Sequence, residues 1–214
     1  MLEVFGRVTS SNVQTVMWLV GELGLAHIRH DVGGSFGGTQ TPEYLAMNPM
    51  GRVPVLRDEH VTLFESQAIL RYLAAAQGAT DLWPTDPVER APVDQWMEWA
   101  KVNFYPVLTY KVFWQLIRTA ARDRDTDLVA QGEAELRELM QIAEAQIGAK
   151  GWLAGDKMTL ADISFGTHLY RYFTVPFERA ELPHLQDYYA RLCARQAYAE
   201  HAMISFEPLR VEGA

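Results

Sequence analysis

The fold is decided by the stretch Asn-Pro-Met-Gly-Arg-Val-Pro-Val-Leu-Arg-Asp-Glu-His-Val-Thr-Leu-Phe-Glu-Ser at positions 48–66. Two apolar runs, 53–56 and 61–64, flank four polar residues, and this pattern predicts a β-hairpin. Pro54 lies inside the first run, although a proline cannot donate a hydrogen bond to a strand ladder. Either the run is not a strand, or the Val53–Pro54 bond is cis and turns the Val53 backbone outward, where an extended peptide can pair with it.

The end of this stretch predicts a ligand site at the start of a helix. After it, apolar residues recur at helical spacing, at Ile69, Tyr72, Leu73 and Ala76. Ser66 is a natural N-cap, and the free N–H groups beside it suit a carboxylate. Glu65 offers a counter-charge for an ammonium group. A small peptide that carries both an amine and a carboxylate therefore fits this arrangement.

In their order, these residues resemble the glutathione-binding half of the soluble glutathione transferases. Val53-Pro54 matches the cis-proline that follows Val or Ile in the family, and Glu65-Ser66 matches the acidic-Ser pair that opens the next helix. The lead-in segments 42–45 and 48–51 also resemble the family. The resemblance covers nearly the whole chain. It implies a cytosolic glutathione S-transferase of bacterial type, with a serine active-site turn like that of the phi and theta classes.

The sequence predicts an α/β plus all-α fold. The resemblance makes residues 1–78 a thioredoxin-like glutathione-binding domain with the order β-α-β-α-β-β-α. The pattern itself gives a strand at 2–5, a helix from Val13 and a second strand at 26–32. Ser11 or Asn12 is expected to cap that helix. The glycine-rich run 33–38 lacks the Gly-Lys-Ser/Thr ending of a nucleotide loop, so we interpret it as a flexible loop beside the ligand site.

The rest of the chain is predicted to be helical. Proline and glycine mark residues 79–90 as a linker, and an all-helical domain at 91–214 contributes the electrophile pocket. Pro106 should kink the first long helix. Thr159-Leu-Ala-Asp162 is a variant of the capping box, which should start a helix through Tyr172. Further helices are expected at 128–147, at 182–195 and near 197.

The catalytic group is predicted to lie after the first strand. A helix N-terminus favours a thiolate, and a hydroxyl that donates to sulfur favours it further. The resemblance gives Ser10 the role of the thiol-activating serine, since Ser10-Ser11-Asn12-Val13 matches the pattern of the serine classes. Ser11 and Asn12 stay open as alternatives. These residues would also cap the helix, and the two roles are compatible.

Other site residues come from weaker matches. The resemblance implies that Arg52 reaches toward glutathione, although an exposed turn residue is an equal alternative. Gln40 lies where some relatives hold the glycine carboxylate, but the usual basic residue is missing there. The acceptor pocket is expected between the domains, although an aromatic stripe on a helix is more often part of the core. Its candidate lining residues are Phe36, Phe104, Tyr105 and Leu108.

Composition excludes several classes of function. The formal net charge of −8 and a pI of about 5.2 argue against nucleic acid or an anionic membrane as the main partner. We find no transmembrane run and no pattern of a signal peptide, and the single cysteine, Cys193, excludes an internal disulfide framework. A cytoplasmic protein is expected. No two of the six histidines have the i, i+4 spacing of a helical zinc site, and His27 and His30 lie in a predicted strand, so no metal is predicted.

The predicted function is that of a glutathione S-transferase, which stabilises the glutathione thiolate for attack on an electrophilic hydrophobic acceptor. Glutathione is the expected co-substrate, and the resemblance implies a homodimer. One alternative is another glutathione-dependent reaction, namely peroxide reduction, dehalogenation or isomerisation. A second is a non-catalytic interaction protein of the same fold. The sequence does not identify the acceptor.

Overall fold

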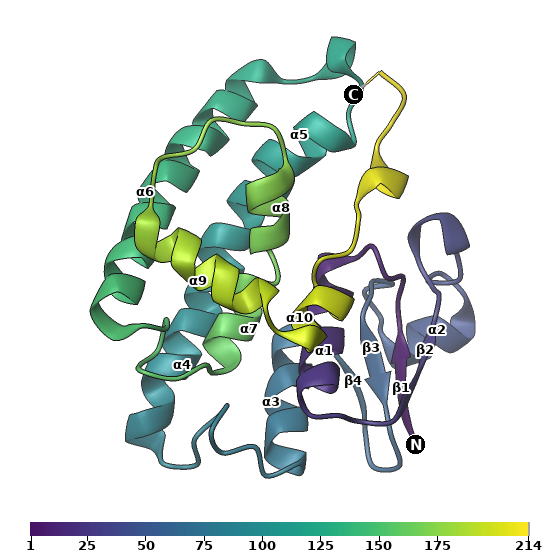
Figure 1. Cartoon of the computed structure of the whole chain (residues 1–214). Coiled ribbons are helices and arrows are strands. Elements are labelled where there is room, and N and C mark those ends of the chain that lie inside the picture. Colours follow the sequence, from purple (N-terminus) through teal and green to yellow (C-terminus); the bar gives the residue numbers. More distant parts are fainter. Residues whose placement is uncertain (214) are drawn as a thin grey trace.

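The computed structural model describes residues 1–213. Figure 1 shows a small sheet at one side of the molecule, with the helices of the second half of the chain stacked beside it. The sheet has the order β2-β1-β3-β4, with β1 parallel to β2 and antiparallel to β3, and β3 antiparallel to β4. The strands are β1 (Leu2–Phe5), β2 (His27–His30), β3 (Val55–Arg57) and β4 (Thr62–Phe64).

Three helices complete this first part: α1 (Ser11–Glu22), α2 (Pro42–Met47) and α3 (Ser66–Ala76). In Figure 1, α1 and α3 lie between the sheet and the second half of the chain, and α2 lies on the other side of the sheet. The resulting order β-α-β-α-β-β-α confirms the thioredoxin-like arrangement predicted from the sequence.

The second part is all-helical, as predicted. Its helices are α4 (Pro87–Trp99), α5 (Trp114–Ile117), α6 (Thr126–Lys150), α7 (Leu160–Gly166), α8 (Leu169–Thr174), α9 (Pro183–Cys193) and α10 (Gln196–His201). Two π-helical segments, Ala100–Phe104 and Val107–Phe113, join α4 to α5. Pro106 lies between them, where wider i→i+5 bonding accommodates a residue that has no N–H to donate. Within residues 1–213, no helix is long and apolar enough to cross a membrane.

The hairpin resolves the conflict that Pro54 poses. The Val53–Pro54 bond is cis, as the sequence predicts, and β3 begins only at Val55. The strand expected at 53–56 therefore begins two residues later and ends one residue later, because the proline stands outside the ladder. Val55 and Leu56 are fully buried in the core.

Both N-caps of the first part lie before the residues predicted for them. The N-cap of α1 is Ser10, not Ser11 or Asn12, since Ser10 has an extended backbone and its carbonyl accepts the Gln14 N–H at 2.9 Å. The N-cap of α3 is Glu65, and Ser66 is the first helical residue. In both helices the N-cap is set by the position where the backbone turns and not by a capping side chain, since neither Ser10 nor Glu65 makes a side-chain capping bond.

The predicted capping box is confirmed at α7. Thr159 accepts the Ala161 N–H, and the Asp162 carboxylate accepts the Thr159 N–H at 2.8 Å. Asp162 is fully buried and also accepts the Leu153 N–H and the Tyr188 hydroxyl, at 3.0 and 2.9 Å. The box therefore joins α7 to the preceding loop and to α9.

The helix that starts at this box ends earlier than predicted. It was expected to reach Tyr172, but α7 ends at Gly166 and α8 begins at Leu169. The Thr167 hydroxyl donates to the Ile163 carbonyl at 2.7 Å, and a threonine that bonds back in this way competes with the helical ladder.

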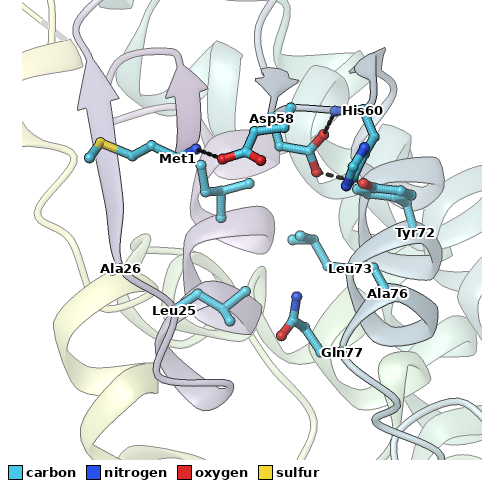
Figure 2. A pocket seen from close by; sticks show the side chains of 11 residues that line it. Met1, Leu25, Ala26, Asp58, His60, Tyr72, Leu73, Ala76 and Gln77 are labelled. Atoms are coloured by element: carbon cyan, nitrogen blue, oxygen red, sulfur yellow. Dashed lines mark hydrogen bonds and ion pairs between the residues drawn. The ribbon is translucent and has the colours of Figure 1, made fainter.

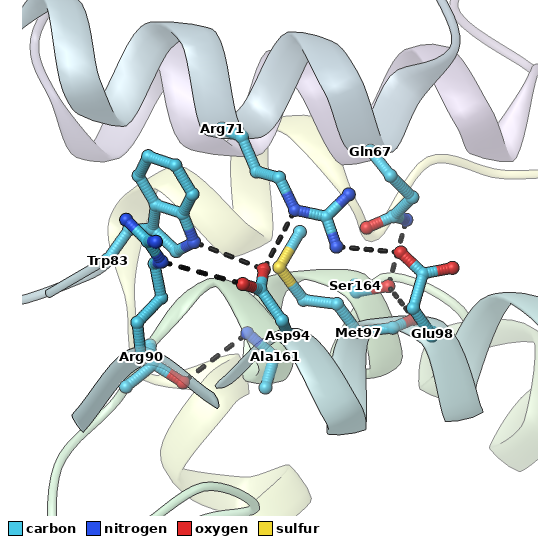
Figure 3. Close-up of polar contacts among 10 residues, drawn as sticks. Gln67, Arg71, Trp83, Arg90, Asp94, Met97, Glu98, Ala161 and Ser164 are labelled. Atoms are coloured by element: carbon cyan, nitrogen blue, oxygen red, sulfur yellow. Dashed lines mark hydrogen bonds and ion pairs between the residues drawn. The ribbon is translucent and has the colours of Figure 1, made fainter. Parts of the chain in front are cut away.

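Polar contacts hold α3 against the helical part (Figure 3). Arg71 of α3 donates to Asp94 and Glu98 of α4, at 2.8 and 2.7 Å. Gln67, also on α3, donates to the Ser164 hydroxyl of α7 at 2.9 Å, and this contact is buried. The helix that begins beside Ser66 is thus fixed from both α4 and α7.

Candidate active site

Two adjoining cavities lie where the sheet part meets the helical part. The first has a volume of about 230 Å³, and the second about 430 Å³. They share five lining residues, so they form one continuous site. The shared residues are Asn12, Arg52, Val53, Tyr105 and Tyr110. The first cavity adds Pro54, Glu65, Ser66 and Lys101, and the second adds Arg7, Ser10 and Trp114.

The wall at Val53 presents a free backbone edge. Within residues 1–213, neither the N–H nor the carbonyl of Val53 makes a backbone–backbone hydrogen bond. The carbonyl of the preceding residue, Arg52, accepts the Tyr44 hydroxyl at 2.8 Å and the Asn48 amide at 2.7 Å. These two bonds fix the turn that leads into the cis bond. An extended peptide can therefore pair with Val53 as an added strand.

The start of α3 forms the end wall of the first cavity. Glu65 is the one non-glycine residue of the described chain with a positive φ, 68°. A residue held there costs about 1–3 kcal/mol, which is typical of functional sites. The first intrahelical bond runs from Ile69 to the Glu65 carbonyl, so the preceding N–H groups are available to a ligand. Ser66 is only 2 % exposed, whereas the Glu65 side chain is exposed.

A polar network crosses the bottom of the first cavity. Asn12 Oδ1 accepts Lys101 Nζ at 2.7 Å and the Ser66 hydroxyl at 3.5 Å, and Asn12 Nδ2 donates to the Tyr105 hydroxyl at 3.4 Å. Burial lowers the pKa of Lys101, and Glu65 opposes that shift. Burial also raises the pKa of Tyr105 to about 12, so its phenol stays protonated at neutral pH. The network thus brings a cation and several donors to the site.

Ser10 reaches the second cavity, at the start of α1. Its hydroxyl makes no capping hydrogen bond, although its N–H donates to the Arg7 carbonyl at 3.1 Å. The hydroxyl is therefore available to a bound group. Ser11 is buried and lines neither cavity, whereas Asn12 lines both.

The predicted acceptor residues divide into two groups. Tyr105 lines both cavities, but Phe104 and Leu108 are fully buried and line neither. Their assignment to the pocket is corrected: they lie on the inward face of the helix, where Phe104 packs against Phe165 with ring centroids 4.9 Å apart. Phe36 is 57 % exposed and lines neither cavity.

The remaining glutathione candidates lie at the rim. Arg52 is exposed and lines both cavities. Gln40 lines neither, but its side-chain amide lies against Gly51, where a Cβ atom would come within 2.2 Å of it. This close approach places the Gln40 amide beside the residue that precedes Arg52.

Sequence reasoning missed two basic residues that line the site and one that supports it. Lys101 comes from the π-helical segment, Arg7 from the turn after β1, and Arg171 from α8. Arg171 is 6 % exposed and donates to the Thr9 carbonyl at 2.7 Å, so the helical part fixes the turn before Ser10. No local pattern marks these positions, since their partners lie far away in the sequence.

A third cavity, of about 260 Å³, lies elsewhere in the first part of the chain (Figure 2). Its walls include Leu25, Leu73 and the hydrogen-bonded pair Asp58 and Tyr72. It lies at the beginning of β1, whereas Ser10 follows the end of that strand, and it contains none of the predicted site residues. Within residues 1–213, no group of three or more His, Cys, Asp or Glu side chains could hold a metal ion.

Two family models match the chain. The glutathione S-transferase N-terminal domain matches residues 9–76, and the glutathione S-transferase C-terminal domain matches residues 100–196. Glutathione S-transferase GstB of Escherichia coli K12 is 34% identical over 206 residues, which cover 95% of this chain and 99% of that protein. Glutathione S-transferase F10 of Arabidopsis thaliana is 32% identical over 93% of this chain and 95% of its own length.

Solved structures similar to this chain are also glutathione S-transferases. The theta class glutathione S-transferase from Xanthomonas axonopodis pv. citri, with glutathione bound, has a TM-score of 0.91 and 42% identity, over 95% of this chain and 98% of that one. Glutathione transferase F7 from Populus trichocarpa has a TM-score of 0.85 and 26% identity, over 96% and 100%. Sequence and structure therefore lead to one conclusion: the chain belongs to the glutathione S-transferase family.

Proposed function

We propose that this glutathione S-transferase binds glutathione in the first cavity and activates its thiol beside Ser10. Glutathione is the co-substrate of the family, and the proposal concerns the residues that hold it. The observation that carries it is the convergence of a free backbone edge at Val53, the open start of α3 and the free hydroxyl of Ser10 on one continuous site. These are the residues through which the sequence resembles the family.

Each part of the tripeptide has a complementary group. The Val53 N–H and carbonyl, beside cis Pro54, pair with the peptide backbone. The Ser66 hydroxyl and the first N–H groups of α3 bind the α-carboxylate, and Glu65 neutralises the ammonium group. Arg52 takes the glycine carboxylate, with the Gln40 amide beside it. Every charged group of the ligand then has a partner of opposite sign or a hydrogen-bond donor.

The chemistry is a transfer of glutathione to an electrophilic carbon. The Ser10 hydroxyl donates to the sulfur, and the dipole of α1 adds positive potential, so the bound thiol loses its proton to solvent more readily. The thiolate electron pair forms the new C–S bond, and the leaving group departs with the electrons of the bond that breaks. The acceptor lies in the second cavity, with Tyr105 shared between both substrates.

Three further features go with this proposal. The thioredoxin-like domain spans residues 1–78, the linker 79–90 and the helical domain 91–214. The enzyme is a homodimer, in which the N-terminal domain of one subunit packs on the helical domain of the other. It works in the cytoplasm. Support comes from the family and, for the last feature, from an acidic chain with a single cysteine.

Replacing Ser66 by alanine should weaken glutathione binding about tenfold or more, because a hydrogen bond to a charged group contributes roughly 1.5–3 kcal/mol. Calorimetric titration with glutathione measures this change. Ser205→Ala is the matched control, because Ser205 is exposed and lines neither cavity. Unchanged affinity in Ser66→Ala would remove Ser66 from the site. No binding by the wild type would instead favour the non-catalytic interaction protein.

A further inference from the structure

Arginines gather around the second cavity. Arg7 lines it, and the Arg118 guanidinium lies 5.1 Å from the ring centroid of Trp114, which lines the same cavity. Arg171 donates a hydrogen bond to the Thr9 carbonyl, in the turn before Ser10. Burial lowers the pKa of Arg7, and the charge of Arg118 lowers it further, so these two cations are close enough to repel each other. In a chain with a net charge of −8, this concentration of positive charge is unusual.

Arg7, which lines the cavity, and Arg118, which lies beside its lining residue Trp114, have no acidic partner. Elsewhere, arginines such as Arg71 and Arg195 form ion pairs with carboxylates, whereas neither Arg7 nor Arg118 does so within residues 1–213. Moreover, Arg7 Nε is buried and has no hydrogen-bond partner. A buried cationic donor without a partner is costly unless a ligand supplies one. Arg7, which lines the cavity, is thus available to an anionic ligand.

The anionic group that these arginines would bind is assigned to the second substrate and not to glutathione. In the function proposed above, glutathione has Ser66 for one carboxylate and Arg52 for the other. Arg7 packs instead against Gly33 and Gly34, with its Nε 3.0 Å from the Cβ position of Gly34. The half-exposed Trp114, which lines the cavity, and Arg118 beside it come from the helical part of the chain.

We propose that the preferred acceptor carries a carboxylate close to its electrophilic carbon, and that Arg7 and Arg118 bind this group. The inference rests on the proposed function. Guanidinium groups bind carboxylates through paired hydrogen bonds, and Tyr110 and Trp114 offer apolar surface to the rest of the molecule. A thiolate and a carboxylate repel each other in solution, so the two cations remove an obstacle that a neutral acceptor does not meet.

A matched pair of acceptors tests this proposal, namely iodoacetate and iodoacetamide. In both reactions the thiolate sulfur bonds to the methylene carbon, and iodide leaves with the electron pair of the C–I bond. The two acceptors differ only in the charged carboxylate against the neutral amide. The readout is the ratio of kcat/KM for iodoacetate to that for iodoacetamide, divided by the same ratio for the uncatalysed reaction with glutathione. In the wild type, the normalised ratio should exceed one.

Arg118→Met and Arg7→Met should each lower this normalised ratio about tenfold, the effect of one charge-assisted hydrogen bond. Arg122→Met is the matched control, because Arg122 is exposed, pairs with Asp123 and lies outside both cavities. It should leave the ratio unchanged. Because Arg118 is exposed, Arg118→Met should fold normally, and it tests the proposal even if Arg7→Met does not fold.

Glutathione titration of the same variants separates two kinds of failure. Unchanged ratios in both arginine variants would overturn the proposed acceptor class, while glutathione binding and conjugation of iodoacetamide would still support the transferase. If Arg7→Met and Arg118→Met lose affinity for glutathione while the normalised kcat/KM ratio stays constant, the proposed acceptor class is also overturned. The two arginines would then bind glutathione. If the wild type neither binds glutathione nor conjugates either acceptor, the proposed function itself fails.

Discussion

Replacing Ser10 by alanine should lower kcat/KM for conjugation about 10- to 30-fold near neutral pH, while the affinity for glutathione stays within about threefold of the wild type. The Ser10 hydroxyl is free of any capping bond and Ser10 lines the second cavity, and the role proposed for it is to donate to the sulfur. Its loss removes a donor that stabilises the charged form of the thiol and leaves the contacts of the peptide at Val53 and Ser66 intact.

The pH dependence distinguishes this role from a structural one. A donor to sulfur depresses the pKa of the bound thiol below the value of about 8.5 for a free thiol. In Ser10→Ala the pKa should return toward that value, so the thiolate fraction falls most at low pH. The ratio of the wild-type kcat to that of Ser10→Ala should therefore be large near pH 6.5 and small above about pH 9. The thiolate absorbance of bound glutathione reports the same shift directly.

Ser11→Ala serves as the neighbouring control, since Ser11 is buried away from both cavities. It should keep activity within a few-fold. Loss of activity in Ser11→Ala or Asn12→Ala, together with nearly full activity in Ser10→Ala, would transfer the role to that residue.

Replacing Asp162 by alanine should lower the free energy of unfolding by about 3–5 kcal/mol. The fully buried carboxylate accepts four hydrogen bonds, from two backbone N–H groups and two hydroxyls. Burial raises the pKa of the Asp162 carboxyl, and these donors oppose the shift. Alanine leaves every donor buried without a partner, and each such donor costs roughly 1–3 kcal/mol when it is not satisfied otherwise.

Urea denaturation followed by circular dichroism measures this loss. Asp187→Ala is the control, because Asp187 is exposed on α9 and should change the unfolding free energy by less than about 0.5 kcal/mol. Asp162→Asn keeps one acceptor oxygen, so its free energy of unfolding should lie between those of the wild type and Asp162→Ala. A stability of Asp162→Ala within about 1 kcal/mol of the wild type would show that the capping box is dispensable.

Local patterns explain what was predicted from the sequence. The cis bond at Val53–Pro54 is one of the two alternatives that a proline in an apolar run leaves open, and the one that the family resemblance implies; the box at Thr159 and Asp162 follows from spacing alone. Strand β1 matches the apolar run 2–5, because its boundaries are set by the adjacent glycine and turn. In each case the determining contacts lie within a few residues.

The features that escaped prediction depend on distant contacts. Lys101 meets Asn12 across 89 positions of sequence, and Arg171 meets Thr9 across 162. Phe104 and Tyr105 are adjacent and both aromatic, so which of them faces the cavity depends on the rotation of the helix against Phe165. Such orientation is a property of tertiary packing, which the composition of a single helix does not encode.

Helix α3 links ligand affinity to the integrity of the whole chain. Its first turn forms the end wall of the first cavity, while Arg71 and Gln67 further along tie it to α4 and α7. A ligand at that turn can bind only while both parts of the chain hold the helix in place. By mass action, its binding free energy then adds to the unfolding free energy of both parts together. Saturating glutathione should therefore make the two halves melt as one cooperative unit.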